Sequence, residues 1–143
     1  VEARFEILNE TYVKKLQIEA RILGDMCLNH VIPAAVKYQN ILIENVKGMK
    51  DIFGDSFMVY CASEVETLKK ISLYINGVSA DVESLVEARK KANRIEDIAE
   101  RAKVYSHEVK DMMEKVRLSA DNLEMLIDDE MWPLPKYREL LFF

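Results

Sequence analysis

Apolar residues recur in alternating steps of three and four along residues 95–126, with no Gly or Pro among them. This heptad period is typical of a helix with one buried edge, and only Ser119 along that edge is polar. At a rise of ~1.5 Å per residue, such a helix is a long rod whose apolar edge needs a cover. The edge consists of Ile95, Ile98, Ala102, Tyr105, Val109, Met112, Val116, Ser119, Leu123 and Leu126.

A similar stripe predicts a first long helix over about residues 3–50. Pro33 lies inside this stretch, and because the stripe continues beyond it we expect a kink rather than an end. Ile18, Ile22 and Met26 widen the apolar arc beyond the ~100° expected of a helix that is covered on one side. Either this helix lies between two others, or its second face packs on a neighbouring domain. The stripe consists of Phe5, Leu8, Tyr12, Leu16, Ala20, Leu23, Cys27, Val31, Ala34, Tyr38 and Leu42.

A second helix is predicted over about residues 56–92, after a connection that contains Gly48 and Gly54. Asp55 or Ser56 is its expected N-cap. Ser72 and Ser79 are small residues on its stripe, which indicates a close approach of another helix there. The stripe consists of Cys61, Val65, Leu68, Ser72, Ile75, Ser79, Val82 and Val86, and Ile71, Val78 and Leu85 widen it.

The phase of this stripe breaks near residue 93 and resumes differently at Ile95. Such a reset predicts a tight reversal at about residues 92–94, with Asn93 and Glu96 as a capping box for the third helix. Short connections make neighbouring helices antiparallel. The sequence therefore predicts an all-α fold, an antiparallel bundle of three long helices over about 3–50, 56–92 and 94–129, followed by an extended Pro-containing C-terminal tail.

The tail is the strongest candidate for an interaction site. Pro133 and Pro135 bias the residues before them away from helical angles, and the chain ends on apolar residues. Trp and Tyr are favoured at contacts between proteins, so the tail either clasps its own bundle or anchors a partner. The predicted interaction residues are Trp132, Pro133, Pro135, Tyr137, Leu140, Leu141, Phe142 and Phe143.

Composition and charge narrow the class of protein. The 143 residues suit a single domain, 1–143, and a net charge of -5 disfavours nucleic acid or an anionic membrane surface as partners. No apolar run approaches the ~20 residues of a membrane span. Cys27 and Cys61 are isolated, as expected of small buried residues in a reduced, cytoplasmic protein. The chain begins at Val1 without an initiator Met, so we expect a fragment of a larger protein.

Motifs for catalysis are not found. A di-metal bundle needs Glu-x-x-His on two helices, whereas Cys27 precedes His30 and Val104 precedes His107 at that spacing. We expect His30 to be a hydrogen-bonded core or interface residue and His107 to be exposed. No P-loop, dinucleotide fingerprint, nucleophile elbow or HExxH occurs. The sequence therefore predicts no catalytic, cofactor-binding or metal-binding residue, and Met112 and Met113 are expected to fill the core.

The ending Trp132-Pro-Leu-Pro-Lys-Tyr-Arg-Glu-Leu-Leu-Phe-Phe143 resembles the terminal pattern of type III glutamine synthetases. The segments Arg4-Phe5-Glu6-Ile7, Ile18-Glu19-Ala20-Arg21 and Val31-Ile32-Pro33-Ala34-Ala35-Val36 resemble the stretch that follows the catalytic domain of that family. The resemblance spans the whole chain, and its segments follow in the same order as in that family. Residues 49–92 carry no motif that is specific to the family. Met131 departs from it, since an aromatic residue is expected before the Trp.

The resemblance implies the C-terminal fragment of an enzyme that joins ammonia to glutamate with ATP and a divalent metal, magnesium or manganese. No catalytic residue of that family falls on this chain. The implied role is non-catalytic, in structure or assembly, with the catalytic domain of the same chain and neighbouring subunits of a homo-oligomer as partners. The alternative is an independent helical interaction module that self-associates.

Overall fold

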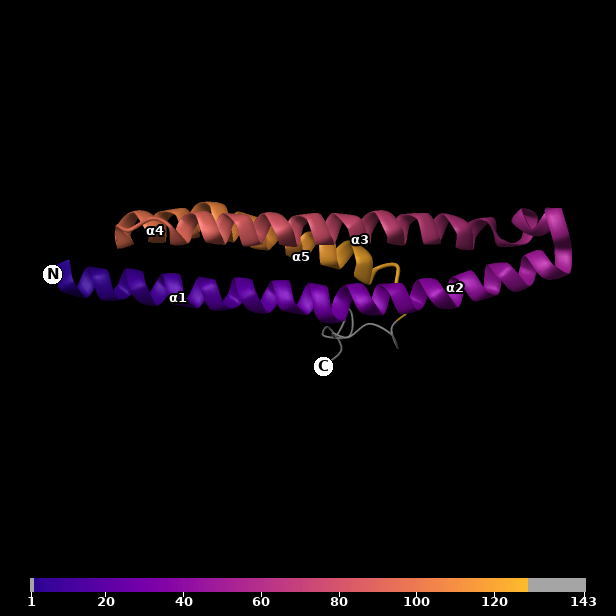
Figure 1. The fold of residues 1–143 in the computed structure, drawn as a ribbon, viewed down its shortest axis with the longest axis horizontal. Coiled ribbons are helices and arrows are strands. Elements are labelled where there is room, and N and C mark those ends of the chain that lie inside the picture. Colours follow the sequence, from indigo (N-terminus) through magenta and orange to yellow (C-terminus); the bar gives the residue numbers. More distant parts are fainter. Residues whose placement is uncertain (1, 129–143) are drawn as a thin grey trace.

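The structure, a computed structural model, describes residues 2–128, with side chains from Ala3 onward, and these residues are almost entirely helical (Figure 1). We call residues 2–53 the first rod and residues 98–124 the third segment. In order, the elements are α1 (Glu2–Met26), a π-helical turn (Cys27–Val31), α2 (Ile32–Phe53), a 3₁₀ turn (Gly54–Ser56), α3 (Phe57–Asn93), α4 (Ile98–Val104), a second π-helical turn (Tyr105–Val109) and α5 (Lys110–Glu124).

The predicted all-α class is confirmed for residues 2–128, but the prediction of three long helices is wrong. The structure has two long helical rods, whereas the third segment is shorter and is divided by a π-helical turn. Its helix ends at Glu124 instead of about residue 129. There the Leu126 N–H donates to the Leu123 carbonyl, a tighter turn that keeps Ile127 buried and leaves Met125 exposed.

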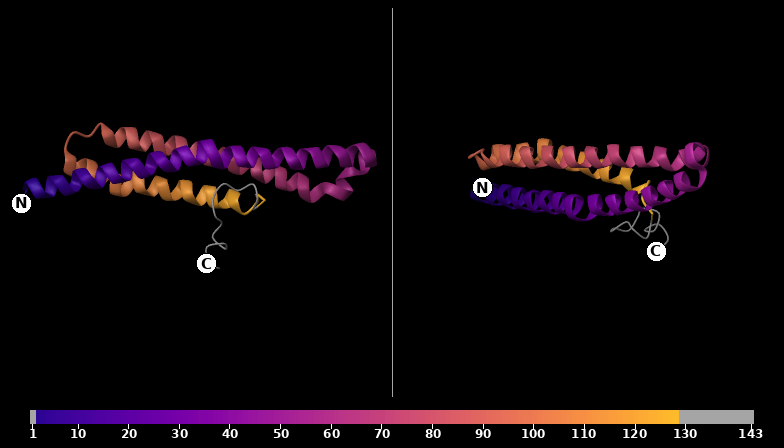
Figure 2. Two further views of the ribbon diagram at one scale, coloured as in Figure 1. Left: turned by 90° about the horizontal axis from the view of Figure 1, so that it is seen from below. Right: turned by 45° about the vertical axis from the view of Figure 1, so that its right-hand side comes forward.

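The shorter third segment covers the two rods along only part of their length. It packs with α4 against α1 and with α5 against α3, whereas α2 packs mainly on α3. Figures 1 and 2 show α2 and the beginning of α3 extending well beyond the end of α5. Three helical segments therefore pack together at one end of the molecule, whereas only α2 and α3 are in contact at the other.

The core follows the three predicted stripes, but the start of the first stripe and the phase of the second differ from the prediction. Every position of the stripe over residues 95–126 is buried or half-buried, and the first stripe is covered from Tyr12 onward. Phe5 and Leu8, predicted to be covered, are exposed. On α3, Ile71, Val78, Leu85 and Ala92 are buried at heptad spacing, and Cys61 and Val82 are buried as well.

Ser72 and Ser79 are exposed, so the predicted close helix approach through them is wrong. The buried edge of α3 runs one position earlier along the chain than the predicted stripe. Ile71, Val78 and Leu85, which the sequence pattern placed at the margin of the stripe, lie at the centre of the buried edge. Large aliphatic residues therefore mediate the contact between α3 and its neighbours.

The helical path passes through Pro33, as predicted. Its local irregularity is the π-helical turn just before, in which the Ile32 N–H donates to the Cys27 carbonyl, five residues back. A proline lacks the N–H for the bond to residue i−4, and its ring crowds that carbonyl. A wider turn ahead of Pro33 relieves this crowding, and the rod bends only gently (Figure 1).

The two connections differ from prediction in detail. α2 continues through Gly48, and the turn itself centres on Gly54, whose φ of 60° suits a residue without Cβ. Ser56 occupies the N-cap position of α3, as predicted, although its side chain makes no capping hydrogen bond.

The predicted capping box of Asn93 and Glu96 is wrong. Asn93 still belongs to α3, and the N-cap of α4 is Asp97, whose Oδ2 accepts from the Glu100 N–H at 3.1 Å. An Asp with Glu three residues later satisfies the same cap geometry four residues further along the chain. The reversal is therefore a short connection before α4 rather than a tight turn at residues 92–94.

Candidate interaction surface

Groups that commonly carry chemistry are dispersed along the bundle. His30 is exposed on the first π-helical turn, so the core alternative of its prediction is wrong, whereas the interface alternative stays a prediction. His107 is exposed, as predicted. Cys27 and Cys61 are buried and free, in line with their prediction as small core residues. Among residues 2–128, no three His, Cys, Asp or Glu residues lie close enough together to hold a metal ion.

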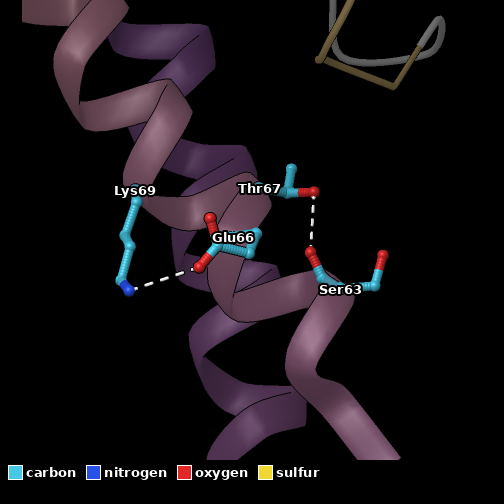
Figure 3. A network of polar contacts seen from close by, with 4 residues as sticks. All are labelled: Ser63, Glu66, Thr67 and Lys69. Atoms are coloured by element: carbon cyan, nitrogen blue, oxygen red, sulfur yellow. Dashed lines mark hydrogen bonds and ion pairs between the residues drawn. The ribbon is translucent and has the colours of Figure 1, made fainter.

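The exposed carboxylates make local or inter-helix contacts of low energy. Figure 3 shows Glu66 paired with Lys69 at 3.3 Å, one turn apart on α3, beside a hydrogen bond from the Thr67 hydroxyl to the Ser63 carbonyl. Solvent-exposed ion pairs of this kind contribute about 0–1 kcal/mol. They indicate a solvated helix face rather than an acid–base site.

One polar cluster joins all three parts of the bundle. The Asn93 Oδ1 on α3 accepts from the hydroxyl of buried Tyr105 and from the Gln17 side-chain amide on α1, the latter at 3.2 Å. Burial raises the pKa of Tyr105, although Arg89 and Arg101 oppose this. A buried tyrosine whose hydroxyl is satisfied fixes how the helices align.

A second polar contact explains Ser119, the one polar residue in the stripe of the third segment. Its hydroxyl donates to Asp81 on α3, and the Lys115 ammonium lies 3.6 Å from the other carboxylate oxygen. Asp81 is only 15% exposed, so this contact is partly shielded from water. It fixes the antiparallel register of α5 against α3.

Large apolar side chains remain exposed on α1, and we call Phe5, Ile7, Leu8, Ile18 and Ile22 the outer α1 surface. Ile18 and Ile22 are one turn apart and are 58% and 55% exposed. Burial between the other two helices, one of the two explanations for the wide apolar arc, is therefore wrong for these two residues. Phe5 and Leu8 also border a groove of about 650 Å³ toward the start of α4.

The far end of the hairpin is a second exposed apolar region, which we call the hairpin tip. It comprises exposed residues on both sides of Gly54: Ile52, Phe53, Met58, Val59 and Tyr60. The Phe53 and Tyr60 rings stack with their centroids 4.2 Å apart. Sequence reasoning placed Ile52 and Phe53 in the first connection and Met58, Val59 and Tyr60 in the second helix, and it assigned no surface to them. The signal was the run Phe57-Met58-Val59-Tyr60, since four successive apolar residues cannot all face one side of a helix.

A third feature is the α2–α3 groove, which lies on the two-helix part of the molecule and has a volume of about 650 Å³. Its apolar lining is Ile43 from α2 with Val65, Leu68 and Leu73 from α3. At one end the Gln39 side-chain amide donates to the Ser72 hydroxyl at 2.8 Å. The remaining lining residue is Lys69.

The tail residues predicted as the interaction site lie outside the described residues. These are Trp132, Pro133, Pro135, Tyr137, Leu140, Leu141, Phe142 and Phe143. The predicted extended tail therefore stays a prediction, as do its two alternatives, a clasp and an anchor. No helix within residues 2–128 is both long enough and apolar enough to cross a membrane.

Residues 1–50 match the protein family described as the glutamine synthetase C-terminal domain. The chain is 47% identical over 140 residues to a glutamine synthetase of Bacteroides fragilis (strain YCH46), an alignment that covers 97% of this chain and 19% of the relative. It is 31% identical over 151 residues to the type-3 glutamine synthetase of Dictyostelium discoideum, with 99% of this chain and 20% of the relative covered.

A glutamine synthetase of Butyrivibrio fibrisolvens is 29% identical over 143 residues, with 99% of this chain and 20% of the relative covered. The chain thus spans about a fifth of the length of these curated relatives. The matched family region, residues 1–50, contains the outer α1 surface and most of the first rod. The chain belongs to the glutamine synthetase family, as a region similar to the C-terminal part of the type III enzymes.

Proposed function

We propose that this chain is a non-catalytic structural and assembly domain of a type III glutamine synthetase, an enzyme that ligates ammonia to glutamate at the expense of ATP. The observation that carries the proposal is the outer α1 surface. Large aliphatic residues such as Ile18 and Ile22 remain exposed within the family-matched residues 1–50. Contiguous exposed apolar side chains are typical of protein–protein contacts.

The partners that suit this surface are the catalytic domain of the same chain and neighbouring subunits of a homo-oligomer, in the cytoplasm. Burying one exposed Leu or Ile side chain at such a contact contributes about 1.5–3 kcal/mol to the free energy of association. A solvent-exposed ion pair contributes only about 0–1 kcal/mol. ATP and the divalent metal, magnesium or manganese, belong to the parent enzyme in this proposal. Among the described residues, no three His, Cys, Asp or Glu side chains lie close enough together to hold the metal.

The experiment is a pair of charge substitutions in the full-length enzyme that carries this chain. Ile18→Lys together with Ile22→Lys places two ammonium groups on the outer α1 surface, and we expect loss of the native oligomer or of the domain contact. Light scattering measures the mass, and limited proteolysis measures release of the domain. Leu118→Lys is the matched control, because Leu118 on α5 is 63% exposed and outside this surface.

An unchanged mass and proteolysis pattern in the double variant would contradict the assembly role. The non-catalytic part has its own test. The 143-residue chain, incubated with glutamate, ammonia, ATP and magnesium, should release no phosphate above the blank, and turnover would overturn that part.

The second candidate is an independent helical module that self-associates. The exposed hairpin tip favours it, because Val59 is 80% exposed and lies beside Tyr60 and Ile52 at the end of a projecting hairpin. Light scattering of the isolated chain against concentration tests it. A mass that stays monomeric at all concentrations counts against self-association and leaves the assembly role untouched.

A further inference from the structure

We propose that the α2–α3 groove is the docking site for this chain's own C-terminal segment, residues 129–143. The groove lies on the part of the hairpin that α5 does not cover, and Ile43, Val65, Leu68 and Leu73 line it. An apolar groove between two helices is the place where a third helix of a bundle would otherwise pack. The proposal does not depend on the assembly role of the outer α1 surface.

The register of α5 on α3 shows where α5 ends along α3. Ser119 donates to Asp81, and the two helices run antiparallel, so each step forward on α5 corresponds to a step backward on α3. α5 ends at Glu124, five residues after Ser119, which corresponds to the level of Asn76, five residues before Asp81. The end of α5 is thus about one helical turn along α3 from Ser72, which lines one end of the groove.

The length of the remaining segment selects this groove over the one beside Phe5. From Ser72 to Val65 is seven helical residues, or ~10 Å, whereas an extended segment of 15 residues reaches ~50 Å. The groove beside Phe5 is 34 residues from Gln39 along the first rod, or ~50 Å, so only the last residue could arrive there. An extended segment of 15 residues can therefore place most of its length in the α2–α3 groove, but not in the groove beside Phe5.

The composition of the segment suits an apolar groove. It carries one Trp, one Tyr, two Phe and three Leu, and such side chains gain most from leaving water. Pro133 and Pro135 have no N–H, so an extended segment that contains them brings fewer unpaired donors into contact with apolar walls.

Trp132 makes the proposal directly measurable, because it is the one Trp in the sequence. It is four residues beyond Asp128 in the sequence, and an extended stretch of that length spans ~13 Å, which is enough for Trp132 to reach the groove. We expect the fluorescence maximum of the 143-residue chain to be blue-shifted relative to the same chain unfolded in denaturant. We expect Ile43→Lys and Leu73→Lys each to move it back toward the unfolded value.

Both substitutions are at exposed groove positions, so the helices should persist, and far-UV circular dichroism checks this for each variant. Leu118→Lys is the matched control and should leave the emission of Trp132 unchanged. An emission maximum at the unfolded value in the parent chain, or one that neither groove variant moves, would overturn the proposal.

The same measurement distinguishes the chain's own tail from that of a second copy. Docking within one chain gives the same blue shift at every protein concentration, with a monomeric mass by light scattering. A blue shift that appears only as the mass doubles would overturn docking within one chain in favour of exchange between two copies.

Discussion

A few polar side chains at the edges of the helix contacts set the alignment of the helices. Asn93 accepts hydrogen bonds from Gln17 and Tyr105, and Asp81 binds Ser119 and Lys115. Each contact joins α3 to another element at one particular register. Apolar stripes alone would permit a helix to slide by a heptad, whereas a buried polar group without its partner costs about 1–3 kcal/mol. These few contacts therefore select one register among several that bury similar area.

The thiol of Cys27 predicts how stability depends on pH. Burial raises its pKa from 9.0 to about 11. Because the folded pKa is the higher one, its contribution is fully present below pH 9 and is lost as pH rises through 11. Two pKa units at ~1.4 kcal/mol each make this loss up to about 3 kcal/mol. Denaturant unfolding across this pH range measures it.

The test compares Cys27→Ala with Val31→Ala. Both remove buried atoms from the first π-helical turn and should lower stability, but Val31 carries no titratable group. We expect the free energy of unfolding of Cys27→Ala to fall less steeply between pH 9 and 11 than that of the parent or of Val31→Ala. Equal slopes in all three proteins would contradict a raised pKa of the Cys27 thiol in the folded state.

At the scale of elements, the N-terminus of α4 depends on a single side chain. The Asp97 carboxylate satisfies the Glu100 N–H, so we expect Asp97→Ala to lower the free energy of unfolding by about 1 kcal/mol. Glu96→Ala is the matched control, with an expected change within about 0.5 kcal/mol. Chemical denaturation measures both. A larger loss in the free energy of unfolding for Glu96→Ala than for Asp97→Ala would contradict Asp97 as the N-cap and favour the predicted capping box of Asn93 and Glu96.

Two glycines of the first connection should respond to alanine in opposite directions. Gly48 is inside α2 with open space around it, so Gly48→Ala should stabilise the protein by about 0.5–1 kcal/mol. Gly54 has φ 60° and ψ −133°, a conformation that is strained for any residue with a Cβ. Gly54→Ala should therefore destabilise by about 1–3 kcal/mol. Thermal unfolding of the two variants measures this, and shifts of the same sign would contradict the turn geometry.

At the scale of the whole molecule, the uneven length of the helices predicts uneven stability. The hairpin tip has only α2 and α3 in contact, whereas residues 78–92 of α3 pack on both the first rod and the third segment. Regions with fewer buried contacts open at lower free energy. We expect backbone amides of residues 50–61 to exchange with solvent faster than those of residues 78–92. Hydrogen exchange with mass spectrometry measures this, and uniform protection would contradict a two-part bundle.

The sequence determined the helical class, the stripe of residues 95–126 and the burial of both cysteines, because these depend on local periodicity and on the hydrophobicity of single residues. It also identified the family through its first 50 residues and its ending. Its errors lie at the ends and phases of helices. Asn93 and Glu96 have the spacing of a capping box, but in the structure α3 extends through Asn93, whose side chain accepts a hydrogen bond from Tyr105.

The tertiary structure alone decided which apolar faces stay open. Ile18 and Ile22 lie on the same apolar arc of α1 as Leu16 and Ala20, so the sequence pattern does not separate the two pairs. In the structure Leu16 and Ala20 are buried and Ile18 and Ile22 are exposed, because the other helices cover only one side of the arc. The length of the third segment depended on a turn after Glu124 that buries Ile127, a contact with another helix rather than a local preference. Periodicity shows which residues need cover, whereas only the assembled helices show how far the cover extends.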